Sequence, residues 1–179
     1  MTIENFAATF SDARGLFLRA CIEAQVSVKT YNHPLRGPAG ELLCADVTRI
    51  GPSQCEHVLF VTSATHGIEG YCGSGIQVGL LAEAKDMLRE QRVAMVLIHA
   101  LNPYGFAWGR RVNEDNVDLN RNFVDHAGGN FPENDLFEVV ADAMIPAQLD
   151  EAHMAACEAR IEAARVEHGV VEIRKAMGK

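Results

Sequence analysis

The chain has 179 residues, of which 48% are apolar and 22% are charged. This length and this balance predict one folded domain with a packed core and argue against global disorder. The net charge of -8 argues against nucleic acid or an anionic membrane surface as a general partner.

The chain carries no sign of export or of membrane insertion. The N-terminus has no basic segment followed by an apolar one, so we expect no signal peptide. No apolar stretch approaches the roughly 20 residues that a membrane span needs. The five cysteines are scattered and show no C-x-x-C spacing. We therefore expect reduced thiols and a cytoplasmic location.

The first fifty residues predict a helix followed by a hairpin. Residues 11–25 carry apolar side chains at helical spacing, with Ser11 placed to cap the helix. The alternating segment 26–31 and the segment 41–50 predict two strands. These strands can pair as a hairpin across a turn-rich connector at 32–40.

Residues 57–101 predict a strand–helix–strand unit. The run 57–64 is almost continuously apolar, which is typical of a strand buried on both faces. Residues 74–91 repeat apolar side chains at helical spacing, and 92–101 predicts a second buried strand. Two strands joined in this way are expected to lie parallel, with a right-handed crossover.

The second half of the chain has a different character. Residues 102–123 are polar and predict a long irregular loop of the kind that is usually functional. Residues 134–144 and 148–169 predict two helices, separated at Pro146. The predicted fold class is therefore α/β: a mostly parallel sheet flanked by helices, with a helical C-terminal segment.

The stretch "THGIEGYCGSG" places His66 and Glu69 just after the strand at 57–64. Ligands of open α/β sheets bind beyond the C-terminal ends of the strands, and a spacing of three residues on a helical turn lets both side chains reach one ion. Imidazole and carboxylate together suit zinc, while Gly67 and Gly70 permit a tight backbone. The alternative is a solvated turn with local hydrogen bonds, and the four-residue pattern alone favours that alternative.

Two other motifs that could begin in this stretch are incomplete. A nucleophile elbow at Cys72 needs glycine at position 74, which is Ser74. A dinucleotide-binding fingerprint that starts at Gly73 needs glycine where Val78 stands. Cys72 is therefore expected to be a small buried residue near a helix start.

The polar loop at 102–123 contains Arg110 and Arg111, followed by Asn120 and Arg121. Arginine can pair with a carboxylate through two parallel hydrogen bonds, so the loop predicts a carboxylate pocket. The alternative is a solvated, charged loop. Because this loop leaves the strand that is expected to lie parallel to 57–64, the predicted pocket lies at the same sheet edge as the His–Glu pair.

Taken in order, "HGIEG", "NPYGF", "GRR" and "DLNRNF" resemble the zinc carboxypeptidase superfamily, which also contains the aspartoacylase and succinylglutamate desuccinylase enzymes. The chain is most similar to a bacterial carboxypeptidase-like family of unknown function. The resemblance covers roughly residues 55–125. Each piece is short, and the ordered set with a strand–helix–strand unit between its parts is what makes the resemblance specific.

The resemblance implies zinc as the cofactor. His66 and Glu69 match the first two zinc ligands of the superfamily. Arg111, or alternatively Arg110, matches the arginine that polarises the scissile carbonyl. A metal-activated water would then attack an amide bond.

The resemblance also implies how substrate is held. Asn120 and Arg121 match the pair that binds the substrate's carboxylate. The substrate would be a small carboxylate-bearing molecule, either a peptide C-terminus or an N-acyl amino acid. Neighbouring side chains of a regular strand face opposite ways, so we expect irregular backbone at 119–123.

The chain departs from the family pattern in its second half. The family's third zinc ligand, a histidine, follows a later buried strand, and its catalytic glutamate follows later still. None of the later histidines follows an apolar strand, and Glu114, Glu133 and Glu138 are candidates for the base only by default. The later histidines are His126, His153 and His168.

The predicted sheet is also shorter than that of the family. Residues 1–130 match the N-terminal part of a zinc carboxypeptidase-like α/β domain, and 131–179 form a helical C-terminal segment of the same domain. A parallel strand left at a sheet edge exposes backbone and apolar groups. This predicts either a missing C-terminal half or a homo-oligomer.

Three functions follow from these observations. The first is a zinc-dependent hydrolase of the carboxypeptidase or deacylase type. The second is a truncated, non-catalytic remnant that keeps the carboxylate pocket but lacks the third zinc ligand and the general base. The third is an unrelated α/β binding protein in which the motifs are coincidental.

Overall fold

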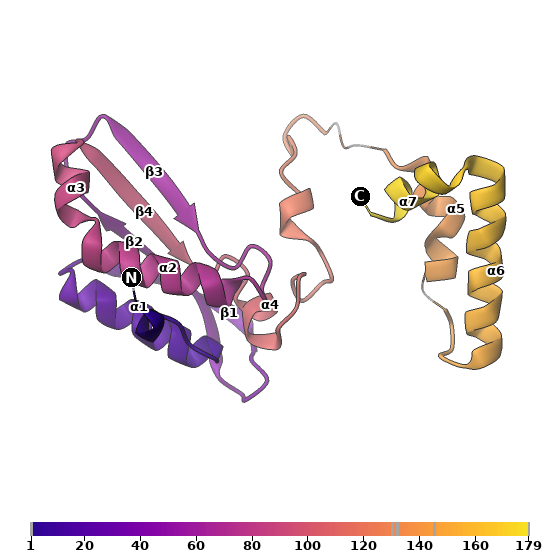
Figure 1. The fold of residues 1–179 in the computed structure, drawn as a ribbon, viewed down its shortest axis with the longest axis horizontal. Helices are drawn as coiled ribbons and strands as arrows, with labels where there is room; N and C mark the ends of the chain where they lie inside the picture. The colour runs from indigo at the N-terminus through magenta and orange to yellow at the C-terminus, as the bar shows by residue number, and fades with distance from the viewer. Residues whose placement is uncertain (1, 130, 132, 145, 179) are drawn as a thin grey trace. The chain divides into compact units, whose positions relative to one another are not determined.

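The computed structural model describes residues 2–129, 131, 133–144 and 146–178. The chain forms two compact units, Met1–Asn122 and Phe123–Lys179. The first unit contains the sheet and the second is helical (Figure 1). The α/β class with helices flanking the sheet is confirmed. The assignment of both units to one carboxypeptidase-like domain stays a prediction.

The first unit is built on a four-stranded mixed sheet in which one of the three strand pairings is parallel, so the prediction of a mostly parallel sheet is wrong. The first two strands form the predicted antiparallel hairpin, and the last two form the predicted parallel pair. The second strand in the chain also pairs antiparallel with the fourth strand in the chain, and this pairing joins the hairpin to the parallel pair in one sheet. In their order across the sheet, the strands are β1 (Val28–Arg36), β2 (Leu42–Ile50), β4 (Val93–His99) and β3 (His57–Thr62).

The helices of this unit follow the predicted periodicity, with different ends. The first is capped by Thr9, whose Oγ1 accepts the backbone N–H of Asp12 at 3.1 Å, and not by Ser11. The predicted helix at 74–91 is two helices that meet at Ala84. The loop at 102–123 contains a further short helix. The helices are α1 (Phe10–Glu23), α2 (Gly70–Glu83), α3 (Lys85–Glu90) and α4 (Pro103–Trp108), with short 3-10 turns η1 (Ile3–Asn5) and η2 (Leu119–Arg121).

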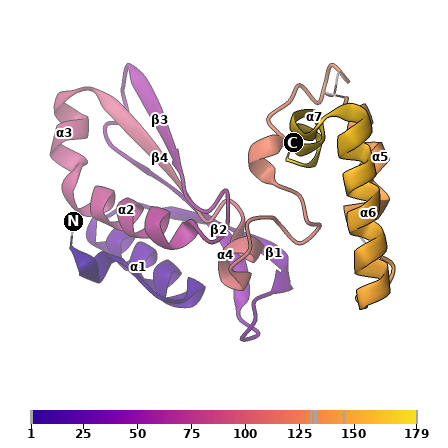
Figure 2. The same cartoon turned by 45° about the vertical axis from the view of Figure 1, so that its right-hand side comes forward.

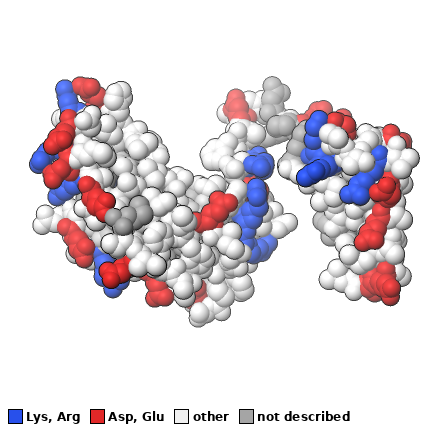
Figure 3. Space-filling model, in the orientation of Figure 1, with Lys and Arg blue, Asp and Glu red and all other residues white. Residues whose placement is uncertain are grey.

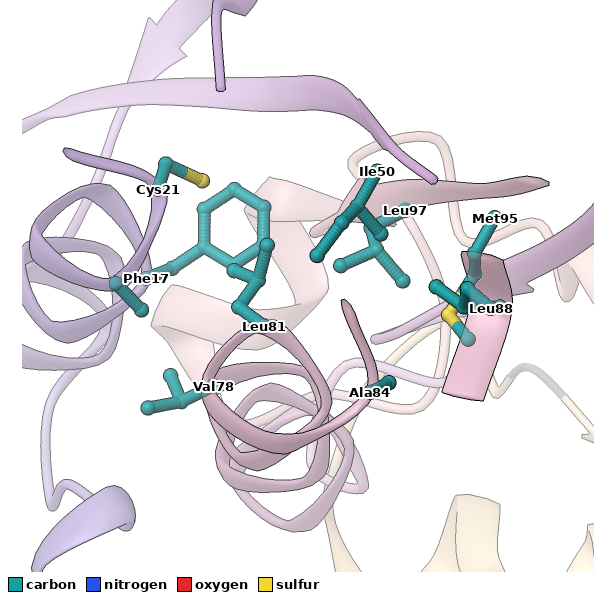
Figure 4. Close-up of a cluster of buried hydrophobic side chains, with 10 residues drawn as sticks. Phe17, Cys21, Ile50, Val78, Leu81, Ala84, Leu88, Met95 and Leu97 are labelled. Atoms are coloured by element: carbon teal, nitrogen blue, oxygen red, sulfur yellow. The ribbon is translucent and has the colours of Figure 1, made fainter. Parts of the chain in front are cut away.

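The core lies between the sheet and α1 and α2, which run side by side on one face (Figures 1 and 2). Phe17 and Leu81 from the helices meet Ile50 and Leu97 from the sheet, as Figure 4 shows, and all four side chains are buried. Burying a large apolar side chain stabilises a fold by roughly 1.5–3 kcal/mol, so this layer fixes how α2 and its first turn sit on the sheet.

The sequence predicted that strand β3 would be buried on both faces, and this prediction is wrong. Val58, Leu59 and Phe60 are exposed by 47%, 51% and 65%, because β3 is the edge strand and α1 and α2 pack on one face of the sheet only. Val61 alone of this strand packs against the core. The strand therefore has the exposed apolar edge that the short sheet predicted, and the partner that would cover this edge stays a prediction.

Acidic and basic side chains are mixed over the surface of α3 (Figure 3), where Arg89 and Asp86 form an exposed ion pair at 3.1 Å. No helix among the described residues is long and apolar enough to cross a membrane. All five cysteines are free thiols. Cys72, which was expected to be buried, is exposed on the first turn of α2.

A buried polar network runs through the helix-covered face of the sheet. Asp46 of β2 has no exposed surface and accepts hydrogen bonds from Arg14 Nε, at 2.7 Å, and from Thr30 Oγ1. His99 of β4 lies opposite Asp46 in the strand register, and its Nε2 is 2.8 Å from Ser74 Oγ. Burial lowers the pKa of His99 to about 4, so the imidazole is neutral at pH 7.

His99 makes the stability of the fold dependent on pH. Its ordinary pKa is 6.5, so between pH 6.5 and 4 the unfolded chain binds a proton that the folded protein does not. The free energy of unfolding is therefore not reduced by His99 above about pH 6.5. As pH falls from 6.5 toward 4, it decreases by roughly 3 kcal/mol. We expect His99→Gln to remove this part of the pH dependence in urea unfolding measured from pH 4 to 7. Equal slopes for His99→Gln and the surface control His57→Gln would contradict this prediction.

The described part of the second unit contains three helices. The first two confirm the helices predicted at 134–144 and 148–169, and the third was not predicted. Val140, Ala164 and Ile173 form a small core between them. The helices are α5 (Asp135–Met144), α6 (Glu151–His168) and α7 (Val170–Met177).

Candidate functional site

The loops that follow β3 and β4 meet at one edge of the sheet. The backbone N–H groups of Leu101 and Asn102 donate to the carbonyl oxygens of Ser63 and Ala64 at 2.9 and 3.0 Å. This contact follows from the parallel pairing, which places both C-terminal strand ends at the same edge. The segment that starts at residue 63 and the segment that starts at residue 100 therefore line one site.

His66 and Glu69 lie together in the loop between β3 and α2. His66 is 9% exposed, and its Nδ1 is 3.0 Å from Oε1 of Glu69, whose side chain is largely exposed. Glu69 immediately precedes α2, and the backbone N–H of Gly70 donates to the Gly67 carbonyl in a tight turn. The pair that the sequence predicted as half of a metal site is thus brought into contact.

Glycine serves close approach in this loop rather than an unusual backbone conformation. Neither Gly67 nor Gly70 has a positive φ. A Cβ on Gly67 would lie 1.9 Å from the backbone carbon of Gly105 in α4, and a Cβ on Gly70 would lie 2.8 Å from the ring of Phe106. The two glycines therefore let α4 pack directly against the loop that carries His66.

Asp118 is the centre of the site. Its Oδ1 is 3.1 Å from His66 Nε2, and Arg111 Nε donates to its Oδ2 at 2.9 Å. The same carboxylate accepts the backbone N–H of Asn120 at 2.9 Å. Burial opposes ionisation, but the hydrogen bonds from Arg111, Asn120 and His66 hold the pKa of Asp118 below its ordinary value. Asp118 is therefore a carboxylate at neutral pH and links the two loops.

The other predicted residues lie on either side of Asp118 in the chain. Arg111 reaches Asp118, while Arg110 faces away: its guanidinium lies 5.8 Å over the ring of Tyr104. Asn120 and Arg121 follow Asp118 on the 3-10 turn η2 with exposed side chains. The irregular backbone expected at this position is confirmed.

The side chains at this edge fit part of a zinc site. A neutral imidazole nitrogen and a carboxylate oxygen 3.0 Å apart can share one ion. A zinc-bound histidine usually donates its other ring N–H to a carboxylate, and Asp118 stands at that nitrogen of His66. A catalytic zinc takes three protein ligands, and the described residues contain no group of three His, Cys, Asp or Glu side chains arranged to hold a metal.

Two features of the site were missed by the sequence analysis. Asp118 lies inside the "DLNRNF" segment, but no role was assigned to it; its position two residues before Asn120 was the available signal. Glu114, a candidate base by default, pairs with His33 of β1, with Nε2 and Oε1 3.0 Å apart. Glu114 therefore joins the loop that carries Asp118 to strand β1.

The fold and the site define an α/β protein with a His–Glu–Asp cluster beyond the C-terminal strand ends. The chain matches the family described as "Protein of unknown function (DUF2817)" over residues 6–179, and it belongs to that family. No curated protein matches the chain.

Two solved structures resemble parts of the chain. The glutaminyl cyclase of Tannerella forsythia is 14% identical, with a TM-score of 0.38, over 53% of this chain and 40% of that one. A Zn-dependent exopeptidase from Parabacteroides distasonis is 10% identical, with a TM-score of 0.37, over 78% of this chain and 49% of that one. The chain spans less than half the length of either structure.

Proposed function

We propose that this chain carries the metal-binding and arginine-bearing part of a zinc-dependent hydrolase that cleaves an amide next to a free carboxylate. One observation carries the proposal: His66, Glu69 and Arg111 come from two separate loops and converge through Asp118. A solvated turn and a solvated charged loop would not predict this convergence. The resemblance to the zinc carboxypeptidase superfamily supports the reaction class.

Each residue has a role that its position supports. His66 and Glu69 would hold the zinc, which when bound supplies a Lewis acid for activating water. Asp118 keeps the imidazole ring in one orientation with Nδ1 toward Glu69. Arg111 brings a fixed positive charge to the same place, where it can stabilise negative charge that develops on a carbonyl oxygen.

The exposed turn η2 supplies the substrate-binding part of the proposal. Asn120 and Arg121 stand two and three residues after Asp118, and both side chains are exposed. A guanidinium and an amide on an exposed turn can bind a carboxylate through directed hydrogen bonds. The proposed substrate is therefore a peptide C-terminus or an N-acyl amino acid, with its free carboxylate at Arg121.

A second candidate is a non-catalytic protein that binds carboxylates. It is favoured by the finding that the described residues contain no group of three side chains arranged to hold a metal. Two-ligand zinc binding is weak, so carboxylate binding at Arg121 could persist without hydrolysis. The two candidates differ in metal content and turnover rather than in the carboxylate site.

Zinc content and carboxylate binding distinguish the candidates. For the hydrolase we expect about one zinc per chain, loss of zinc in His66→Ala but not in the control His57→Ala, and hydrolysis of an N-acyl amino acid that Arg121→Ala impairs. Binding of the N-acyl amino acid that Arg121→Ala abolishes, without zinc or turnover, would select the second candidate. If neither His66→Ala nor Arg121→Ala changed the zinc content, the hydrolysis or the binding of the N-acyl amino acid, both candidate functions would be overturned.

A further inference from the structure

The loop 109–118 delivers both Arg111 and Asp118 to His66, and two pairs of side chains hold it. We propose that His33 and Glu114 are positioning residues that fix this loop, and with it the orientation of the His66 ring. The inference deepens the proposed function, because it concerns how the same site is kept ready to bind a metal.

The loop has a defined internal shape. It begins at Gly109, whose φ of +62° ends α4 in the left-handed conformation. The Asn113 side chain accepts the backbone N–H groups of Asp115 and Val117 at 3.1 and 2.8 Å, and Asn116 has a φ of +63°. Asparagine tolerates that conformation and bonds its own following backbone, so the loop turns back on itself as one unit.

One contact ties this unit to the helix before it. The guanidinium of Arg110 lies 5.8 Å over the ring of Tyr104 in α4 and donates to the Asn116 side-chain oxygen at 3.1 Å. The contact thus joins the start of the loop to its far turn. It also explains why Arg111 and not its neighbour faces Asp118.

The second contact ties the loop to the sheet. His33 Nε2 of β1 lies 3.0 Å from Glu114 Oε1, and the two side chains are 13% and 27% exposed. The pair bridges residues that are 81 positions apart in the chain. A partly buried hydrogen-bonded pair loses less to competing water than a surface pair does, and this one anchors a loop that has no fully buried residue.

The anchor matters for the site because the contacts it supports are short and directed. Asp118 must stay about 3 Å from both His66 Nε2 and Arg111 Nε to hold them, and a shift of 1 Å in the loop would break such hydrogen bonds. Residues that act through a metal ligand's hydrogen-bond partner can change metal affinity without touching the metal. His33 and Glu114 are therefore placed to set the orientation of His66 from outside the site.

The test compares Glu114→Ala and His33→Ala with Glu114→Gln, which keeps a hydrogen-bonding group for His33. We expect each alanine variant to weaken Zn²⁺ binding about 3- to 10-fold, with the double variant no weaker than either single one, because the pair acts as a unit. We expect Glu114→Gln to restore most of the affinity. Glu56→Ala, which breaks the exposed pair with Arg92, is the matched control and should have no effect.

A second measurement does not depend on the metal. In the metal-free protein, the ring ¹⁵N and ¹H resonances of His66 report its hydrogen bond to Asp118, and we expect Glu114→Ala and His33→Ala to move them toward their positions in Asp118→Ala. Unchanged His66 resonances in both alanine variants would overturn the proposal. If the resonances move but wild-type protein binds no zinc, the proposed function fails and the positioning role stands.

Discussion

Replacing Asp118 with asparagine is expected to weaken Zn²⁺ binding by about 10- to 100-fold, which is the usual cost of losing a carboxylate behind a metal-ligating histidine. If zinc were bound, the carboxylate would accept the Nε2 proton of His66, and Nδ1 would be available to the ion. Asparagine keeps the shape but only one of the two acceptor oxygens, and it loses the negative charge. Its NH₂ group would face either His66 Nε2–H or Arg111 Nε–H, so it cannot accept a hydrogen bond from both.

The control for this change is Asp115→Asn, which makes the same chemical substitution three residues earlier in the same loop, at an exposed position. Titration calorimetry with Zn²⁺ on the two variants and the wild type measures the effect, and circular dichroism checks that the fold is kept. Equal affinities for the two variants would show that Asp118 does not support the metal site.

Most of the fold could be predicted because it is encoded locally. The alternation in 26–31 and the strand pattern in 41–50 predicted the hairpin. The apolar runs on either side of a helix with apolar residues at helical spacing predicted the parallel pair β3–β4. The edge position of β3 could not be predicted in the same way. An apolar run shows that a strand can be buried, but the burial of Phe60 depends on which other segments pair with the strand.

The candidate site likewise has a part that is encoded locally and a part that is not. His66 and Glu69 are three residues apart, so their contact follows from a single turn of backbone. Asp118 is 52 residues from His66, and no periodicity or spacing connects the two positions. The resemblance placed Asn120 and Arg121 in the site, but the contact between the neighbouring Asp118 carboxylate and His66 could be recognised only once the loops after β3 and β4 were seen to meet.

Replacing Gly67 with alanine is expected to destabilise the protein by about 3 kcal/mol and to abolish Zn²⁺ binding, because the new methyl group overlaps the backbone of α4. Its Cβ would lie 1.9, 2.2 and 2.3 Å from the carbonyl carbon and oxygen of Gly105 and the nitrogen of Phe106. A flexible side chain could move aside, but these atoms belong to α4. Either α4 or the loop that carries His66 must therefore shift.

The matched control is Gly15→Ala in the middle of α1, where a Cβ would meet nothing within 4 Å. That change is expected to stabilise the protein by about 0.5–1 kcal/mol, since alanine loses less backbone entropy in a helix than glycine. Urea unfolding of both variants gives the two free energies of unfolding. If Gly67→Ala matched the wild type in stability and in zinc affinity, the close packing of α4 on the His66 loop would be incorrect, and with it the way the site is held together.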